Sequence, residues 1–215
     1  MINKKIAFLH TSPLHIERFE NLVKKYNDTI EIKHFVDEDL LHLALETGVL
    51  DKEKFVKTIQ KIQAEQQIKM VICTCSTYGQ LCEPFETVYR IDQPIVDTIV
   101  AKYAKIALAY TAPSTKKTSQ QLILQTAARQ QKKIQLIDAD CTHCWPYFEE
   151  GNIAKYERSI AQHLRQISQE VEVIFLAQAS MEGAKKYLLD IKPSVVSSPA
   201  FGVKTFLAGL LEKGK

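Results

Sequence analysis

One cysteine of this chain, Cys75, lies in a setting that suits acid–base or nucleophilic chemistry. It follows the apolar run Met70–Cys73 and is flanked by the hydroxyl side chains of Thr74 and Ser76. A thiol donates a proton, and its thiolate accepts one or attacks carbon. Because Cys75 also lies near an expected helix start, we expect its pKa to fall from about 8.5 towards neutrality. Cys73 lies inside the apolar run and is expected to be an inert core residue.

The segment that carries Cys75 belongs to a repeat with a spacing of about one hundred residues. At the corresponding position the second copy carries Gln178, and a side-chain amide transfers no proton. We expect the two copies to face each other across a cleft, in which one face of a ligand meets the thiol and the other meets the amide. The matched pairs are Lys5–Pro13 with Lys105–Pro113, Val36–Asp39 with Ile137–Asp140, and Met70–Thr77 with Val173–Ser180.

Short apolar runs rich in β-branched residues alternate with amphipathic patterns, which is typical of an α/β fold with parallel sheets. Together with the repeat, this predicts two pseudo-symmetric three-layer αβα lobes with the active-site cleft between them. The first lobe is expected to span residues 1–97 plus about 200–215, and the second 98–199. We expect buried strands at Ile6–Leu9, Ile30–Val36, Met70–Cys73, Ile106–Tyr110, Ile134–Ile137 and Val173–Ala177. A last short strand is expected at Ser194–Ser197. The expected helices are Ile16–Tyr26, one capped by Asp51, Ser119–Gln131, Ile153–Ser168 and about Val203–Glu212.

Hydroxyl side chains are concentrated where these strands end. Ligands of open parallel sheets bind beyond the carboxyl ends of the strands, and the amides at a helix N-terminus favour an anion. Hydroxyls and amides with little cationic charge therefore predict a carboxylate ligand. The alternative is that these Ser and Thr side chains only cap helices. The expected substrate-binding residues are Thr11, Ser12, Ser76, Thr77, Thr111, Ser114, Thr115, Ala179 and Ser180.

Histidines near the strand ends are candidates for a second proton carrier. His10 and His15 flank the end of the first strand, and His143 lies in the segment Cys141–Cys144. A histidine in such a place is either a proton carrier or a hydrogen-bonded scaffold residue. The CxxC spacing of Cys141–Cys144 also fits a metal site, but the remaining cysteine pair lies at a strand end rather than on a loop. We therefore expect no metal.

Composition excludes several classes of function. The chain has 215 residues, of which 46% are hydrophobic and 25% charged, as is ordinary for a globular protein. A net charge of +3 is too weak to indicate nucleic acid binding, and no apolar run approaches the roughly 18 residues of a membrane span. With seven glycines and no glycine-rich loop after the first strand, we expect no pyrophosphate cradle of the dinucleotide or P-loop type. Five cysteines, an odd number, and no signal-peptide pattern predict a cytoplasmic protein.

The pattern resembles the aspartate/glutamate racemase superfamily, which includes glutamate, aspartate and hydantoin racemases, maleate isomerase and arylmalonate decarboxylase. Cys75-Ser76-Thr77 is similar to the family's first catalytic motif, a strand that ends in Cys-Asn-Thr. The turn Thr111–Thr115 is similar to a Thr-rich turn that opens the family's second half, and Leu176–Ala179 is similar to its second motif, Leu-(Gly/Ala)-Cys-Thr. The resemblance covers nearly the whole chain. It implies two similar α/β lobes, a catalytic cysteine, no cofactor and a homodimer.

Two positions depart from that family pattern. Gln178 replaces the second catalytic cysteine, and His10–Ser12 stands where glutamate racemases have Asp-Ser-Gly. The resemblance therefore implies an enzyme that uses Cys75 as a one-sided acid, base or nucleophile on a small carboxylate or amino acid, with Gln178 orienting the substrate. Racemisation, isomerisation and decarboxylation remain open. The alternatives are an aspartate or glutamate racemase with His10 or His143 as second base, and a non-catalytic carboxylate-binding protein.

Overall fold

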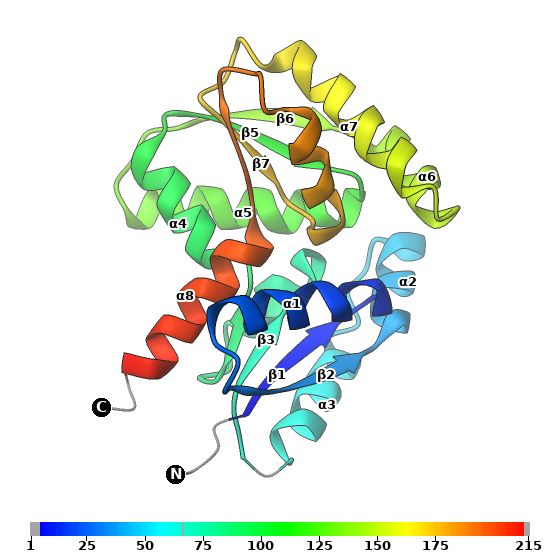
Figure 1. The fold of residues 1–215 in the computed structure, drawn as a ribbon, viewed down its shortest axis with the longest axis vertical. Coiled ribbons are helices and arrows are strands. Elements are labelled where there is room, and N and C mark those ends of the chain that lie inside the picture. The colour runs from blue at the N-terminus through cyan, green and yellow to red at the C-terminus, as the bar shows by residue number, and fades with distance from the viewer. Residues whose placement is uncertain (1–4, 66, 213–215) are drawn as a thin grey trace. The chain divides into compact units, whose positions relative to one another are not determined.

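A computed structural model describes residues 5–65 and 67–212 of the chain. Their internal contacts form two compact units. Unit 1 comprises the described residues of Met1–Gln93 and Pro199–Lys215, and unit 2 comprises Pro94–Ser198. Each unit contains one four-stranded parallel sheet between helical layers (Figure 1). The chain therefore folds as two α/β lobes, and each lobe has its own hydrophobic core.

The sheet of unit 1 has the strand order β2-β1-β3-β4, with every neighbouring pair parallel. Alternate residues of a strand face opposite sides of a sheet. On one side, Ala7 and Leu9 of β1 join the core that α2 and α3 cover, which includes the fully buried Phe55 of α3. On the other side, Phe8 packs against Phe19 of α1, with ring centroids 5.3 Å apart. The strands are β1 (Lys5–His10), β2 (Glu31–Val36), β3 (Ile68–Cys73) and β4 (Val88–Arg90).

The helices of unit 1 include the C-terminal helix α8, which packs next to β4. Phe206 of α8 contacts Tyr89 of β4, with ring centroids 5.3 Å apart. Gly202 permits this close approach, because a Cβ at that position would lie 2.4 Å from the carbonyl oxygen of Ile91. The helices are α1 (Ile16–Tyr26), α2 (Glu38–Thr47), α3 (Lys52–Gln63) and α8 (Ser198–Glu212), with 3-10 helices η1 (Pro13–His15) and η2 (Ser76–Cys82).

Unit 2 repeats this arrangement with the strand order β6-β5-β7-β8, again all parallel. Ile106 and Leu108 of β5 face the core formed with α4 and α5, whereas Ala107 and Ala109 face the core formed with α7. The strands are β5 (Lys105–Tyr110), β6 (Gln135–Asp140), β7 (Val173–Leu176) and β8 (Ser194–Ser197). The helices are α4 (Gln93–Lys102), α5 (Pro113–Arg129), α6 (Trp145–Glu149) and α7 (Ile153–Ile167), with 3-10 helices η3 (Thr142–Cys144) and η4 (Ala179–Tyr187).

The predicted fold class is confirmed, and the expected strands are present in two sheets of the same order. The prediction that the strands before residue 190 are all buried is wrong for β2 and β6. No residue of β2 is buried, and Ala139 alone is buried in β6. Both are edge strands, which have a neighbouring strand on one side only. The segments α2, α4 and β4 were not predicted, and α5 and α8 begin earlier than expected, at Pro113 and Ser198.

The start of α3 provides a test of a local prediction from the sequence. Asp51 precedes the helix, and its Oδ1 accepts a hydrogen bond of 2.8 Å from the backbone N–H of Lys54. Asp51→Ala is expected to lower the free energy of unfolding by about 1 kcal/mol, since it leaves that N–H without its cap. Urea denaturation of this variant and of Asp28→Ala, which removes the same charge from an exposed turn, measures the effect. Equal loss in both variants would contradict the capping role.

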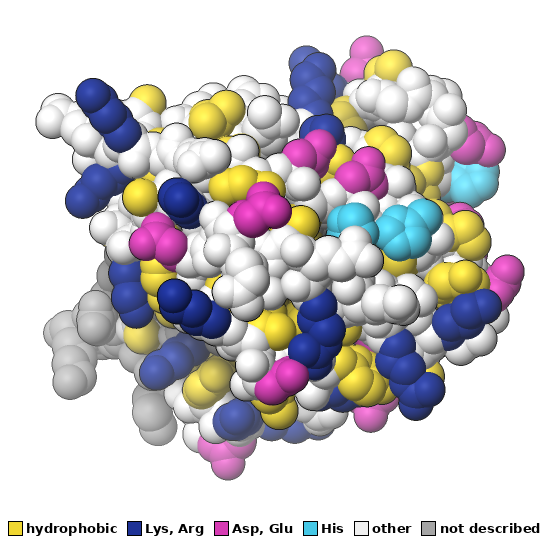
Figure 2. Space-filling view, turned by 90° about the horizontal axis from the view of Figure 1, so that it is seen from above, with side chains coloured by type: hydrophobic (Ala, Val, Ile, Leu, Met, Phe, Trp, Pro, Cys, Tyr) yellow, Lys and Arg dark blue, Asp and Glu magenta, His cyan; other side chains and the backbone are white. Residues whose placement is uncertain are grey.

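The surface shows charges of both signs. Figure 2 shows Lys and Arg side chains interspersed with Asp and Glu over the face it presents. Mixed charge on that face differs from the clustered basic surface that nucleic acid recognition requires. Among residues 5–65 and 67–212, none of the helices has the length and apolar character that crossing a membrane demands.

Candidate active site

Cys75 lies at the carboxyl end of β3, in the segment that joins this strand to η2, and its side chain is half-buried. The hydroxyl of Thr11 and the backbone N–H groups of Thr77 and Tyr78 lie at the sulfur and favour its thiolate. Burial and the neighbouring thiol of Cys73 act in the opposite direction and are stronger. They raise the pKa of Cys75 to about 11.

The expected lowering of the Cys75 pKa is therefore wrong. It depended on the start of an α-helix, but the segment after β3 is a 3-10 helix in which Ser76, Thr77, Tyr78 and Gly79 are all buried. Burial is the largest influence on the Cys75 sulfur, and it disfavours a charged thiolate. At neutral pH Cys75 is a thiol that holds its proton.

The titration of Cys75 can be measured directly by its reaction with iodoacetamide, which alkylates the thiolate. We expect the rate to rise about tenfold per pH unit and to level off only near pH 11. Thr11→Val should move this plateau to higher pH, because it removes a hydrogen bond that favours the thiolate. Mass spectrometry of the peptide that contains Cys75 gives the rate at each pH. A plateau near pH 8.5 would contradict the raised pKa.

A buried ion pair packs against η2. Arg90, the last residue of β4, donates from Nε and Nη2 to the two carboxylate oxygens of Asp92, at 2.7 and 3.0 Å. Both residues are buried. Gly79 of η2 lies directly on the guanidinium group, since a Cβ at Gly79 would come within 2.8 Å of it. The pair therefore helps to fix the segment that follows Cys75, and nothing in the sequence pattern indicated it.

His10, the last residue of β1, is fully buried and uses both ring nitrogens within unit 1. Its Nδ1 lies 2.8 Å from Thr74 Oγ1, and its Nε2 lies 2.8 Å from His34 Nδ1. The Thr74 hydroxyl donates to the carbonyl of Leu9 at 3.1 Å, so it accepts from His10 Nδ1–H. His10 Nε2 then accepts the hydrogen bond that His34 Nδ1–H donates. These partners assign the Nδ1–H tautomer to both rings.

The surroundings also keep His10 uncharged. Burial, with His34 and His15 nearby, lowers the pKa of His10 to about 3. Its ring packs against Phe19 and His34, with centroid distances of 5.4 and 5.1 Å. A neutral, enclosed ring with both nitrogens bonded has the environment of a scaffold residue. The proposed role of His10 as a proton carrier thus stays a prediction without support from its geometry.

In unit 2 the position that repeats Cys75 is Gln178, which follows β7. Its Oε1 accepts three hydrogen bonds: from the backbone N–H groups of Thr111 and Ala112, at 2.6 and 3.1 Å, and from the Thr111 hydroxyl, at 3.1 Å. The two units therefore share a contact: Thr11, after β1, lies at Cys75, after β3, and Thr111, after β5, lies at Gln178, after β7. The repeat seen in the sequence extends to this hydrogen-bonding arrangement.

Tyr156 of α7 holds this arrangement in place, and the sequence analysis missed it. Its hydroxyl lies 2.9 Å from Thr111 Oγ1 and 3.0 Å from Ser180 Oγ. Because Thr111 donates to Gln178, its oxygen accepts from Tyr156, and Tyr156 accepts from Ser180. Burial raises the pKa of Tyr156 to about 12, so the phenol keeps its proton. Its position in the sequence gave no sign of this network.

The predicted hydroxyl residues are mostly enclosed. Ser12 Oγ accepts from the N–H of Leu14 at 3.4 Å and caps η1. Thr111 and Ser180 bond within unit 2, as described above. Ser114 and Gln178 are half-exposed. The other predicted residues, all buried, are Thr11, Ser76, Thr77, Thr115 and Ala179. Their contact with a substrate stays a prediction.

The CxxC segment of unit 2 lies against the core. Cys141 and Cys144 are buried, and burial raises the pKa of both thiols, that of Cys144 to about 11. His143 is exposed and packs edge-on against His163, with ring centroids 5.3 Å apart. In the part of the chain that the structure describes, no three His, Cys, Asp or Glu side chains are grouped to hold a metal ion.

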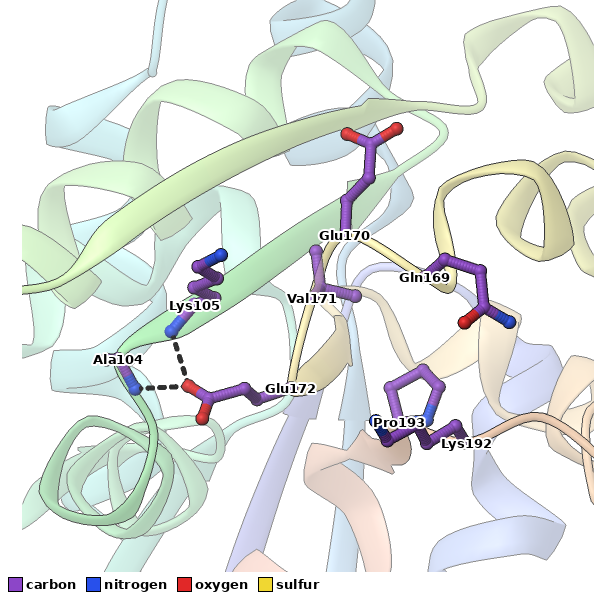
Figure 3. Close-up of a pocket in the computed structure, with 8 residues that line it drawn as sticks. All are labelled: Ala104, Lys105, Gln169, Glu170, Val171, Glu172, Lys192 and Pro193. Atoms are coloured by element: carbon purple, nitrogen blue, oxygen red, sulfur yellow. Dashed lines mark hydrogen bonds between the residues drawn. The ribbon is translucent and has the colours of Figure 1, made fainter.

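A hollow of about 440 Å³ lies in unit 2 near the amino ends of β5, β7 and β8, whereas Gln178 lies at the carboxyl end of β7 (Figure 3). There Glu172 Oε2 accepts from the N–H groups of Ala104 and Lys105, at 2.7 and 2.8 Å. These two backbone donors are thus already used by the chain itself. Ligands of open parallel sheets bind at the carboxyl ends of the strands, and we do not assign this hollow to the chemistry of Cys75.

Comparison with known proteins identifies the class of fold. No family model and no curated protein sequence matches this chain. A glutamate racemase from Francisella tularensis, solved in complex with D-glutamate, matches with a TM-score of 0.77 at 14% identity, covering 100% of this chain and 83% of that one. An aspartate racemase from Picrophilus torridus matches with a TM-score of 0.75 at 13% identity, covering 98% and 94%. An allantoin racemase from Pseudomonas fluorescens matches with a TM-score of 0.66 at 16% identity, covering 98% and 92%.

The chain thus has a two-lobe, three-layer α/β fold shared with racemases. More particularly, it is the fold of the glutamate, aspartate and allantoin racemases compared above, and the fold that the resemblance implied is confirmed.

Proposed function

We propose that this protein is a cofactor-independent enzyme of the racemase, isomerase or decarboxylase type that acts on a small carboxylate or amino acid, with Cys75 as its proton-transferring thiol. The observation that carries the proposal is the place of Cys75. It is half-buried at the carboxyl end of an inner parallel strand, beside hydroxyl and amide donors. This is the edge at which open parallel sheets bind ligands. The similarity in fold to glutamate, aspartate and allantoin racemases supports the same class of reaction.

The raised pKa of Cys75 keeps the thiol protonated at neutral pH, so the sulfur carries a proton that it can transfer. The S–H bond breaks and a C–H bond forms at the carbon α to the carboxylate, where a carbanion or enolate supplies the electron pair. The sulfur is left as a thiolate, which the Thr11 hydroxyl and the N–H groups of Thr77 and Tyr78 stabilise until water returns a proton. In the reverse direction, this thiolate removes the proton from the same carbon.

A single thiol implies that protons are exchanged on one face of the substrate carbon. Gln178 occupies the repeat position of Cys75 and has no proton to transfer. Of the two histidines considered as a second base, His10 and His143, the first is less well supported, because both nitrogens of His10 are bonded within unit 1. The homodimer and the cytoplasmic location remain proposals from the sequence.

Turnover of a panel of small carboxylates tests this function. The panel holds each enantiomer of aspartate and glutamate, maleate, and a substituted malonate, and chiral chromatography follows the product. We expect conversion of at least one compound without added cofactor. Complete racemisation of aspartate or glutamate would favour the two-base alternative. Ligands that raise the melting temperature but are never converted would contradict the proposal and support a binding protein.

A further inference from the structure

The side chain of Gln178 is held in one orientation by its partners. Its oxygen faces two backbone N–H groups, those of Thr111 and Ala112, and the Thr111 hydroxyl. A backbone N–H only donates, so the amide atom that meets Thr111 and Ala112 must be the oxygen and not the nitrogen. The exchange of amide oxygen and nitrogen, which is often ambiguous in glutamine, is excluded here by two donors on the same atom.

The fixed oxygen determines what Gln178 presents on its other side. The oxygen is used inside unit 2, so Nε2 and its two N–H groups form the free end of this half-buried side chain. Within the described residues of the chain, no protein group accepts a hydrogen bond from this Nε2. Hydrogen bonds among the hydroxyls of Ser180, Tyr156 and Thr111 hold in place the Thr111 hydroxyl that donates to Gln178. Gln178 is therefore a donor at the strand end and cannot act there as an acceptor.

We propose that Gln178 is a specificity-determining residue that binds a hydrogen-bond acceptor oxygen of the substrate, from a carboxylate or a carbonyl group, and disfavours an ammonium group at that point. This inference rests on the proposed function and narrows its substrate class. An ammonium group has donors only, so it finds no partner on the amide nitrogen. Carboxylate oxygens find two N–H donors whose direction is set before binding, which reduces the cost of ordering.

Gln178→Glu is the sharpest test, because it keeps the size and shape of the side chain. One carboxylate oxygen can take the place of Oε1 and receive the same three hydrogen bonds. The other oxygen then puts an acceptor with negative charge where the wild type has a donor. Gln166→Glu, on the exposed side of α7 in the same unit, makes the same change in net charge and serves as the matched control.

Two readouts follow, and neither depends on turnover. First, calorimetric titration with malonate and succinate is expected to give dissociation constants roughly 10- to 100-fold weaker for Gln178→Glu than for the wild type, and unchanged for Gln166→Glu. Second, NMR titration is expected to place the pKa of the new carboxyl at position 178 below the ordinary value of about 4.3, because three donors favour its ionised form.

The outcomes separate this inference from the proposed function. Equal affinity of wild type and Gln178→Glu for both dicarboxylates, or no binding by the wild type, would overturn the donor role. A raised pKa of the new carboxyl would overturn the donor arrangement itself. Weaker binding by Gln178→Glu in a protein that converts no carboxylate would sustain this inference while the proposed enzyme activity fails. Equal turnover of a carboxylate by the wild type and Gln178→Glu would support the proposed enzyme activity and overturn the role inferred for Gln178.

Discussion

Cys75→Ser is expected to lower the turnover of the carboxylate substrate by a factor of roughly 10² to 10⁴, the usual contribution of a positioned acid or base. A serine hydroxyl has nearly the same size, but it is a much weaker acid than a thiol, so it cannot deliver a proton to the substrate carbon at the same rate. The side chain is half-buried rather than at the centre of the core. The loss should therefore appear in kcat with little change in the unfolding temperature.

Cys144→Ser provides the matched control for that experiment. It makes the same sulfur-to-oxygen change at a buried thiol of unit 2, whose pKa is also raised to about 11. We expect this variant to retain turnover once its folding has been checked by circular dichroism. Similar losses in both variants would mean that the effect at Cys75 is structural.

Asp92→Asn is expected to be the most destabilising single substitution considered, by about 3–5 kcal/mol. It removes the charge that faces the Arg90 guanidinium, and both residues lie in the interior of unit 1. A buried charge without its partner costs far more than the pair contributes. Urea denaturation followed by fluorescence measures the change in the free energy of unfolding. Because Gly79 lies on the guanidinium group, the variant should also disturb the segment that follows Cys75.

Two comparisons make this prediction specific. Asp190→Asn removes the partner of Arg165 in an exposed pair that is also bidentate, with Nη1 and Nη2 at 2.9 and 2.7 Å from the two carboxylate oxygens, and little change in stability is expected there. The double variant Arg90→Met, Asp92→Leu replaces both charges with apolar side chains and should be less destabilised than Asp92→Asn. A double variant as unstable as the single one would indicate that packing rather than unpaired charge causes the loss.

The fold could be predicted from the sequence because its signals are repeated and local. The run Val173–Ala177 and its partner Met70–Cys73 are apolar, contain β-branched residues and end at polar residues, and both are inner strands of their sheets. The exposed strands β2 and β6 were assigned correctly as strands but wrongly as buried, since an apolar run does not reveal which strand is at an edge. The short strand β4 has three residues, too few for a periodic signal.

The candidate site was predicted less completely, for physical reasons. The residue types at Cys75 and Gln178 were visible in the sequence, and so was their equivalence in the repeat. The pKa of Cys75 was not, because it depends on how far burial outweighs the donors around the sulfur. The partners of His10 come from positions 34 and 74, so only the folded sheet brings them together. The same holds for Tyr156, which reaches Thr111 from α7.

The most direct test of the account is the fate of deuterium in heavy water. The wild type and Cys75→Ser are incubated with the substrate found in the carboxylate screen, and NMR with chiral chromatography reads both deuterium content and configuration. We expect the wild type to place one deuterium at the α-carbon in a single configuration, and Cys75→Ser to place almost none. Equal incorporation in the two proteins, or a racemic deuterated product from the wild type, would contradict a single thiol acting from one face.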